Sequence, residues 1–396
     1  MSYLQTSKFM TTTRTLLSII AAAALSLSAM AQEKELHNSI HLGLVYPLST
    51  NGIHAQNYSN TVSLHAIGGI SSSEEALCAS GLGNVILNDA KGLAAAGFFN
   101  YIGGNANGIV ASGFFSSVKN DVEGLQVSGF GNISGSVSGL QSAGFFNINR
   151  NDLSGAQMAG FMNISGTTDA QFAGFLNIAD DVPYTQIGGF CNIAKDATTQ
   201  LAGFINKSDD ATVQLAGFIN IAKDAKVQMA GFMNIADSCD YPIGLINIMK
   251  KGEKTIGLSI DESQTVLASF RSGGRIMYGI VGVGYNLSMA DLMYGFEAGI
   301  GAHLPVSKMF RINFEAAGTG LVNFTGDGNY KFAVRALPAV TLGGKWELFA
   351  GPTVSFLNMN LYTNDPFEGY SFWSSNNWGR DYSLSLGAIA GIQLHL

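Results

Sequence analysis

Two adjacent stretches, VQLAGFINIAKDAK (213–226) and VQMAGFMNIADSCD (227–240), are close copies of one 14-residue unit. The core of this unit, A-G-F-x-N, recurs along the middle of the chain at intervals of 13–16 residues. Its glycine stands at twelve positions: 81, 97, 113, 129, 144, 160, 174, 189, 203, 217, 231 and 244. Self-similarity at a short, nearly fixed period indicates a repeat array, so these repeats decide the fold.

The repeat unit is too short for a pair of helices, and its phenylalanine, isoleucine and glycine favour strands. A repeat unit of this length is compatible with either an antiparallel meander or a parallel solenoid. Successive turns of a meander lie at opposite ends, whereas a solenoid stacks the same turn in every coil. The turns 194–197 and 222–225 share the sequence Ala-Lys-Asp-Ala. We therefore favour a parallel β-solenoid of about twelve coils, roughly 55 Å long at ~4.8 Å per coil.

Two rows of amide side chains accompany the glycines. Asparagine stands three residues after the glycine, with Ser116 as the one exception, at Asn84, Asn100, Asn132, Asn147, Asn163, Asn177, Asn192, Asn206, Asn220, Asn234 and Asn247. Glutamine stands three residues before it at Gln126, Gln141, Gln157, Gln171, Gln186, Gln200, Gln214 and Gln228. Identical amides one coil apart can form a hydrogen-bonded ladder. A substrate site needs a few different polar groups, so we interpret both rows as structural.

A row of phenylalanines directly follows the glycines at Phe98, Phe114, Phe130, Phe145, Phe161, Phe175, Phe190, Phe204, Phe218 and Phe232. If each coil bends at Gly-Phe, the rings pack in the core, and this is the arrangement we favour. Without that bend they share a face with the amides and form an exposed aromatic platform. The candidates for such a platform are Phe161, Phe175, Phe190, Phe204, Phe218 and Phe232. Such a platform would bind glycan or dock on the surface of another protein.

The overall composition excludes several classes of protein. Of 396 residues, 12% are charged and 49 are glycine, against roughly 25% charged and 7% glycine in typical soluble proteins. Seven prolines and 47% hydrophobic residues do not fit collagen or a disordered chain. The net charge of −7 excludes a basic nucleic-acid-binding surface as the main theme. Three cysteines, an odd number, do not form a disulfide framework.

The first residues have the pattern of a secretory signal peptide. Lys8 and Arg14 precede a short apolar stretch (16–25), which runs to the small-x-small sequence Ala29-Met30-Ala31. We predict cleavage after Ala31, so that the mature chain begins at Gln32.

From residue 275 onwards the sequence changes to long two-residue alternation. One face is apolar and the other small or charged in 293–304, 309–323, 330–343 and 382–396, which is typical of strands in an outer-membrane β-barrel. With 39–47, 61–70, 275–287 and 345–358, these segments predict eight strands. The segments 255–260 and 265–271 could add a further pair. The alternative is a soluble barrel or sandwich.

The inward face of the predicted barrel carries charges of both signs, at Glu297, Arg311, Glu315, Arg335 and Glu347. An eight-stranded barrel is filled by its own side chains and is not a pore. Mixed charges in such a lumen favour structural ion pairs over catalysis.

The expected organisation is a signal peptide (1–31), first barrel strands (32–71), the repeat array (72–252) and the remaining barrel strands (253–396). Barrel termini of this class lie in the periplasm, so two strands before the array would place the array on the periplasmic side.

The sequences PLSTNG (47–52), NYSN (57–60) and VSL (62–64), followed by the A-G-F-x-N array, resemble a family of exported surface-repeat proteins of Gram-negative bacteria. The resemblance spans nearly the whole mature chain. It implies a location at the cell surface, on the side opposite to that expected from the strand count. This family has no established activity, so the resemblance implies no catalytic residue.

The array contains no recognisable catalytic or metal-binding motif. Its acidic residues lie at turns beside lysines, at Asp180, Asp181, Asp196, Asp209, Asp210 and Asp224. We therefore expect no enzyme, no catalytic or metal site and no cofactor. The prediction is a non-enzymatic outer-membrane protein with a structural, adhesion or ligand-binding role. Its partners would be outer-membrane lipid and either glycan or another envelope protein, and not nucleic acid. The alternative is a secreted glycan-binding or glycan-active β-solenoid.

Overall fold

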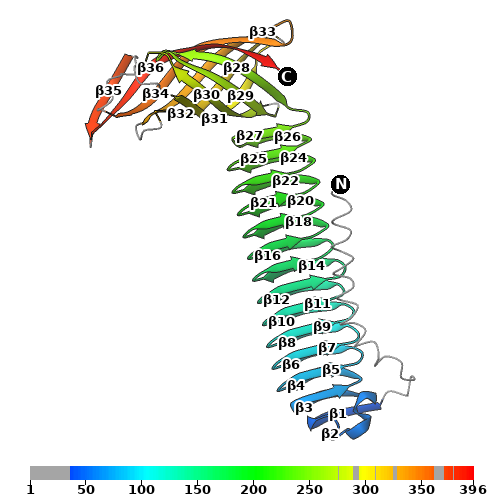
Figure 1. The fold of residues 1–396 in the computed structure, drawn as a ribbon. Coiled ribbons are helices and arrows are strands. Elements are labelled where there is room, and N and C mark those ends of the chain that lie inside the picture. The colour runs from blue at the N-terminus through cyan, green and yellow to red at the C-terminus, as the bar shows by residue number, and fades with distance from the viewer. Residues whose placement is uncertain are drawn as a thin grey trace.

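The computed structural model describes residues 36–274, 276–288, 294–307, 309–323, 328–360, 370–377 and 379–396. Strands make up 76% of the structure and helix about 2%. A parallel β-solenoid of about 13 turns leads into a closed antiparallel β-barrel of eight strands, which confirms the predicted fold class (Figure 1). Within the described ranges, no helix is long and apolar enough to cross a membrane. The predicted cleavage site at Ala31 and Gln32 lies outside the described residues.

Each coil of the solenoid consists of a long strand, a corner at the repeat glycine, a short strand and a second turn. The long strands are β4 (Ser73–Ser80), β6 (Ala90–Ala96), β8 (Ala106–Ser112), β10 (Val122–Ser128), β12 (Val137–Ala143), β14 (Leu153–Ala159), β16 (Thr168–Ala173), β18 (Asp181–Gly188), β20 (Asp196–Ala202), β22 (Asp210–Ala216), β24 (Asp224–Ala230) and β26 (Ser238–Ile243). The short strands are β5 (Gly83–Ile86), β7 (Phe99–Ile102), β9 (Phe115–Val118), β11 (Gly131–Ser134), β13 (Phe146–Asn149), β15 (Met162–Ile164), β17 (Leu176–Ile178), β19 (Cys191–Ile193), β21 (Ile205–Lys207), β23 (Ile219–Ile221), β25 (Met233–Ala236) and β27 (Ile246–Met249).

Successive coils pair in parallel and in register, so each row of the sequence becomes a row along the rod. Gln200 of β20 pairs with Gln214 of β22, and the next short strands pair in the same way. The strands of a meander would pair antiparallel. The parallel pairing therefore confirms the solenoid and excludes the meander. The corner requires glycine, because a Cβ at Gly203 would overlap the carbonyl oxygen of Gly189 in the preceding coil.

The two strands expected to begin the barrel belong instead to the solenoid. β1 (Leu36–Val45), β2 (Leu48–Ser49) and the 3-10 helix η1 (Gly52–Asn57) cap its end, and β1 pairs in parallel with β3 (Tyr58–Ser71). β3 in turn pairs in parallel with β4 and β5. The assignment of 32–71 to the barrel is therefore wrong for the described part of this segment. The cap alternates as a barrel strand does, since Ile40 is 57% exposed and its neighbour His41 only 1%.

All eight barrel strands follow the solenoid: β28 (Glu253–Asp261), β29 (Thr265–Gly273), β30 (Met277–Asn286), β31 (Tyr294–Pro305), β32 (Phe310–Val322), β33 (Gly328–Leu342), β34 (Trp346–Asn360) and β36 (Arg380–His395). Antiparallel pairing of β28 with β36 closes the barrel. The optional segments 255–260 and 265–271 thus lie in its first two strands. β35 (Tyr370–Asn377) pairs with β36 as an additional, exposed strand.

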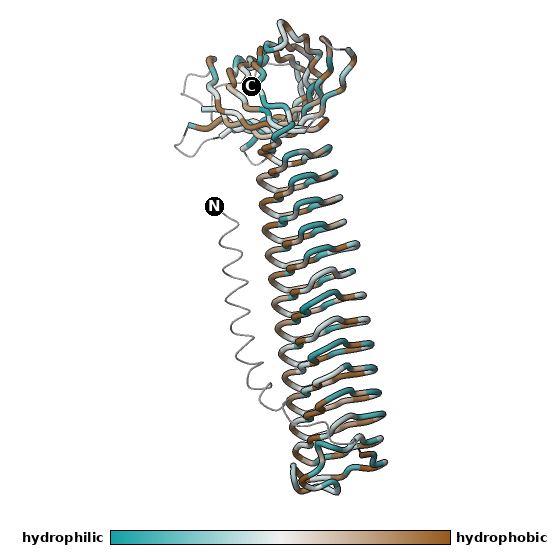
Figure 2. Tube along the Cα trace, turned by 90° about the vertical axis from the view of Figure 1, so that its right-hand side faces the viewer, coloured by the Kyte–Doolittle hydropathy of each residue, from teal (hydrophilic) through white to brown (hydrophobic). Residues whose placement is uncertain are grey.

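The last coil of the solenoid stacks directly on the outer wall of the barrel. Asn247 donates from its backbone N–H to Ser272 Oγ at 3.1 Å and from its side-chain Nδ2 to the Ser272 carbonyl at 3.2 Å. The corner residues Gly244 and Leu245 lie against Gly279 of β30. The barrel wall therefore takes the place of a further coil. As a result the solenoid, a straight rod, projects from the side of the barrel, and its long axis is roughly perpendicular to the barrel axis (Figures 1 and 2).

Candidate functional site

The two amide rows lie in the interior of the solenoid, where Asn163, Asn177, Asn192, Asn206, Asn220, Asn234, Gln171, Gln186, Gln200, Gln214 and Gln228 are all 0% exposed. Each of these asparagines donates from Nδ2 to Oδ1 of the asparagine in the next coil at 2.8–3.0 Å. Each of these glutamines donates from Nε2 to Oε1 of the glutamine in the preceding coil at 2.8 Å. The two ladders run in opposite directions, so their amide dipoles oppose one another.

The amides also bond the backbone. Asn206 Nδ2 donates to the carbonyl of Leu215 at 2.6 Å, and Gln200 Nε2 donates to the carbonyl of Lys207 at 3.3 Å. The glutamine ladder ends at Gln228, because Pro242 occupies its position in the next coil. Gln228 Oε1 is thereby left without a hydrogen-bond partner among the described residues. The other amides are bonded within the stack, so the rows support a structural role rather than a substrate site.

The phenylalanine row lies on the outside, and the core packing that we favoured is wrong. Phe98, Phe114, Phe145, Phe175, Phe190, Phe204, Phe218 and Phe232 are 36–47% exposed. Adjacent rings stack with centroids 4.7–5.1 Å apart and planes within 14°. Each ring face is covered by its neighbour, so the row presents ring edges to its surroundings.

A shallow groove of about 730 Å³ follows the first coils beside the glycine corners. Its floor is built from small residues, including Ala79, Ala95 and Ala111, with Leu64 and His65 at one end. Most of this lining is apolar, and its polar members include Ser80 and His65, whose Oγ and Nδ1 atoms lie 3.4 Å apart.

A buried polar cluster lies in the capped end of the solenoid. Glu74 Oε1 accepts from Ser63 Oγ at 2.7 Å and from Asn60 Nδ2 at 3.2 Å. Burial raises the pKa of Glu74 to about 7, although these hydrogen bonds oppose the shift. Burial, together with His65 nearby, lowers the pKa of His41 to about 4. The side chains of this cluster are 0–6% exposed, so their protonation is coupled to the stability of the capped end.

The second turn of the coils carries the charges of the solenoid. Asp181, Asp196, Asp210 and Asp224 pair in register and form a row of like charges. Partial burial and the neighbouring carboxylates raise the pKa of Asp210. In the part of the chain that the structure describes, no group of three His, Cys, Asp or Glu side chains could hold a metal ion.

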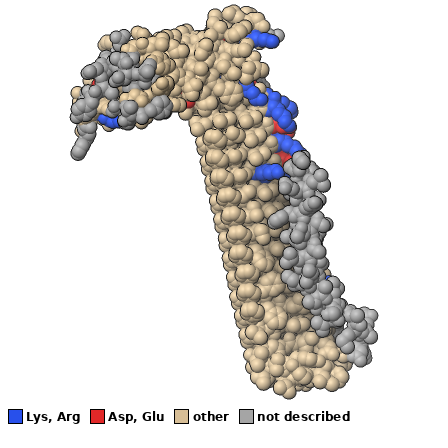
Figure 3. Space-filling view, viewed as in Figure 1, with Lys and Arg blue, Asp and Glu red and all other residues tan. Residues whose placement is uncertain are grey.

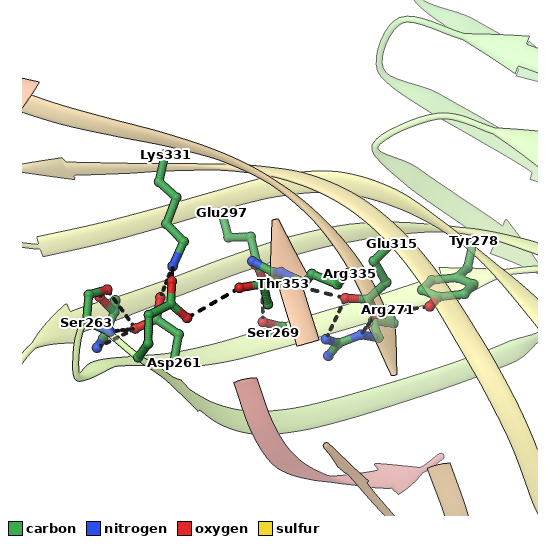
Figure 4. A network of polar contacts seen from close by, with 12 residues as sticks. Asp261, Ser263, Ser269, Arg271, Tyr278, Glu297, Glu315, Lys331, Arg335 and Thr353 are labelled. Atoms are coloured by element: carbon green, nitrogen blue, oxygen red, sulfur yellow. Dashed lines mark hydrogen bonds and ion pairs between the residues drawn. The ribbon is translucent and has the colours of Figure 1, made fainter. Parts of the chain in front are cut away.

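The charged residues predicted for the barrel lumen all point inward and form ion pairs. Arg335 contacts Glu297 at 2.7 Å and Glu315 at 3.4 Å. Arg311 contacts Glu347 at 2.9 Å. Further lumen ion pairs involve residues that were not among the predicted lumen charges, namely Arg271, Lys331, Asp261, Glu262 and Glu253 (Figure 4 shows some of these contacts). Arg271 and Asp261 could have been found, because they lie in or beside the optional strands 255–260 and 265–271.

The outer wall of the barrel is apolar. Along β33, Phe332 and Val334 are each 56% exposed, whereas Lys331 and Arg335 beside them are 3% and 2% exposed. Tyr330, Leu342 and Trp346 are also exposed near the ends of their strands. The barrel is therefore polar inside and apolar outside, the reverse of a water-soluble barrel.

No family model and no curated protein matches the chain. One similar solved structure comes from work described as "De novo design of transmembrane beta-barrels". It is 15% identical, the alignment covers 37% of this chain and 94% of that one, and the TM-score is 0.22.

Proposed function

We propose that this chain is a non-enzymatic outer-membrane protein in which the barrel anchors a rigid β-rod. The observation that carries the proposal is the reversed polarity of the barrel. An apolar exterior with a charged interior is stable in lipid, where exposed backbone groups are satisfied by the closed sheet. In water the same surface would be an exposed apolar patch far larger than soluble monomers tolerate.

The size of the apolar wall fits a bilayer. The outward face of β33 is apolar from Tyr330 to Leu342. At ~3.3 Å per residue and a tilt of about 40°, this distance spans roughly 30 Å of membrane, close to the ~25 Å apolar band of outer-membrane barrels. The lumen is occupied by the network around Arg335, Arg271 and Lys331. The barrel therefore serves as an anchor and not as a channel.

The rod belongs on the periplasmic side under this proposal. The expectation of two barrel strands before the array is wrong, because all eight barrel strands follow it. The first barrel strand, β28, nevertheless begins at the barrel rim that carries the solenoid, and the last strand, β36, ends at the same rim. The connections at that end, 274–276, 306–309 and 343–345, are short. Short turns and chain termini mark the periplasmic end of such barrels. Export through the predicted signal peptide is part of the proposal.

The geometry gives less support to the alternative of a glycan-binding solenoid. Sugars stack on the faces of aromatic rings, and the faces of Phe190 and its neighbours are covered by one another. The role that remains for the rod is structural or adhesive, with a protein or a lipid as its partner. Membership of the surface-repeat family is part of the same proposal, although that family's surface location would require the opposite orientation.

The proposal is tested by expressing the full chain with its own leader in a Gram-negative host. We expect extraction from the membrane only with detergent, and a change in gel migration on heating. Val334→Arg on the outer wall should cost about 2–4 kcal/mol in the bilayer. The matched control is Ile109→Arg on the exposed solenoid surface, which should cost far less. A soluble periplasmic protein, or a Val334→Arg variant as stable as the control, would falsify the membrane anchor.

Antibody labelling of intact cells, with epitope tags at Asp209 in the solenoid and at Asn376 in β35, determines on which side of the outer membrane the rod lies. Labelling at Asn376 alone supports a periplasmic rod, whereas labelling at Asp209 places the rod outside.

A further inference from the structure

The junction between the solenoid and the barrel fixes which edge of the rod faces the membrane. The residues on the second-turn side of the last coil lie at the barrel rim, where Gly252 is beside Gly273 and Cys239 is beside Gly274. The glycine corner lies further from the rim, because Gly244 and Leu245 contact Gly279, two residues into β30. Leu245 holds the phenylalanine position of its repeat. The phenylalanine edge is thus displaced towards the apolar band of the barrel, and the second-turn edge away from it.

The phenylalanine edge is free of charge along the whole array. No charged residue stands within three positions of any of the twelve repeat glycines. The lysines and acidic residues of the solenoid lie on the second-turn side instead, for example Lys195, Asp209 and Lys223. Figure 3 shows charged side chains on one edge of the rod, in the coils near the barrel and on the side away from the barrel's far end. The rod therefore has one apolar and one charged edge, as an interfacial amphipathic element does.

The aromatic edge is large enough to bind a surface. Ten rings at one per coil form a row roughly 43 Å long at ~4.8 Å per step. If each exposes about two-fifths of roughly 200 Å², the row presents on the order of 800 Å² of apolar area. Patches of more than a few hundred Å² mark interaction or membrane sites in folded proteins. Exposed aliphatic side chains such as Met158, Ile187 and Met229 widen this edge.

We propose that the rod lies along the bilayer in which the barrel is anchored, with the phenylalanine row inserted in the lipid interface and the charged turns in water. This inference rests on the proposed membrane anchor. The rod runs across the barrel axis, and hence along the membrane plane (Figures 1 and 2). Its apolar edge is continuous, through Leu245, with the outer wall at Gly279. A second copy could cover the row only by entering the space between the rod and the bilayer.

The test is quenching of tryptophan fluorescence by brominated phospholipids in vesicles that hold the full chain. The three native tryptophans are first replaced by phenylalanine. Single tryptophans are then introduced as Phe190→Trp on the aromatic edge, Thr198→Trp on the opposite, exposed side of the rod, and Val334→Trp on the barrel wall. Phe98→Trp and Phe232→Trp report the far and near ends of the row. They also replace Phe190→Trp if that variant does not fold.

We expect Phe190→Trp to be quenched at least about half as strongly as Val334→Trp, and Thr198→Trp to remain close to unquenched, because interfacial groups sit at the headgroup and acyl boundary. Loss of quenching at Val334→Trp would overturn the membrane anchor itself. Quenching at Val334→Trp without quenching at Phe190→Trp would overturn only the position of the rod. Quenching confined to Phe232→Trp would show that the rod leaves the surface, which also contradicts the proposal.

Discussion

The solenoid and the barrel both bury polar side chains and expose apolar ones, but they satisfy the buried groups differently. The solenoid interior is neutral, with ladders such as Asn192–Asn206–Asn220. The barrel interior is charged, with pairs such as Arg335–Glu297. In a repeat stack the neighbour of every side chain is the same side chain, so a buried group must pair with a copy of itself. An amide has both donors and an acceptor and can do this, whereas a charge cannot. In the barrel the neighbours come from different strands, and opposite charges can be placed together.

The largest effect is expected from breaking the charged interior. Arg335→Leu removes the cationic partner of Glu297, which keeps only its hydrogen bond from Ser269, and one of the cationic partners of Glu315. We expect the barrel to lose about 3–5 kcal/mol, because the carboxylates left behind stay buried without this cation. The midpoint of the heat-dependent gel shift in detergent measures the loss. Arg335→Lys, which keeps the charge, should recover part of it. A cost below about 1 kcal/mol would mean that water already solvates these carboxylates.

The second test concerns the close packing that repetition requires. Gly203→Val places a side chain against the carbonyl oxygen of Gly189, and parallel strand pairing on both sides of the corner holds these two coils together. We expect a loss of about 3 kcal/mol, within the range of overpacking and backbone strain. Gly318→Val in the barrel is the matched control, since its Cβ would meet only Phe332 at 3.7 Å and the Ala298 carbonyl at 3.9 Å. Thermal unfolding followed by circular dichroism compares them, and equal effects would contradict tight stacking of the coils.

Asn206→Asp asks directly whether the ladder must be neutral. The new carboxylate still accepts from Asn192, but it no longer donates to Asn220 or to the backbone of Leu215. We expect a loss of about 2–3 kcal/mol at pH 7, because a charge and two unpaired acceptors are buried. Protonation of the carboxyl restores one donor, so the loss should shrink at pH 4. A loss that is the same at both pH values would show that charge is not the reason for the amides.

These contrasts also explain what the sequence could predict. Repeat spacing identified the coils and the amide rows, because stacking turns each sequence position into a row in space. Strand alternation identified most of the barrel. It failed for Leu36–Val45 and Tyr58–Ser71, because the cap of the solenoid is also apolar outside and polar inside. Period-two alternation reports the two faces of a strand and not its partner. The exposure of Phe190 depends on the bend at the glycine corner, which the pattern left undetermined.

The capped end of the solenoid contains one buried carboxyl group, that of Glu74, in an interior that is otherwise neutral. The unfolded carboxyl of Glu74 loses its proton near its ordinary pKa of 4.5, whereas burial keeps the folded one protonated to about 7. The free energy of unfolding therefore falls as pH rises through this window. Glu74→Gln should remove that fall and gain about 3 kcal/mol at pH 8, with little change at pH 4. Chemical denaturation at both pH values measures it, and a gain at pH 4 as large as at pH 8 would contradict the assignment.

The smallest effect is expected on the charged edge, where repetition stacks like charges in water. Asp210 lies in register between Asp196 and Asp224, and its pKa is raised by partial burial and by these two carboxylates. The folded state thus holds its proton to a higher pH than the unfolded state does, and stability falls as pH rises through that range. Asp210→Asn should give a small gain at pH 7 that increases at low salt, because screening of exposed charges weakens there. The adjacent Asp209 faces Lys223 at 2.8 Å, so Asp209→Asn should have the opposite sign. If both variants shift the melting temperature in the same direction, the row of carboxylates is not what sets the stability of this edge.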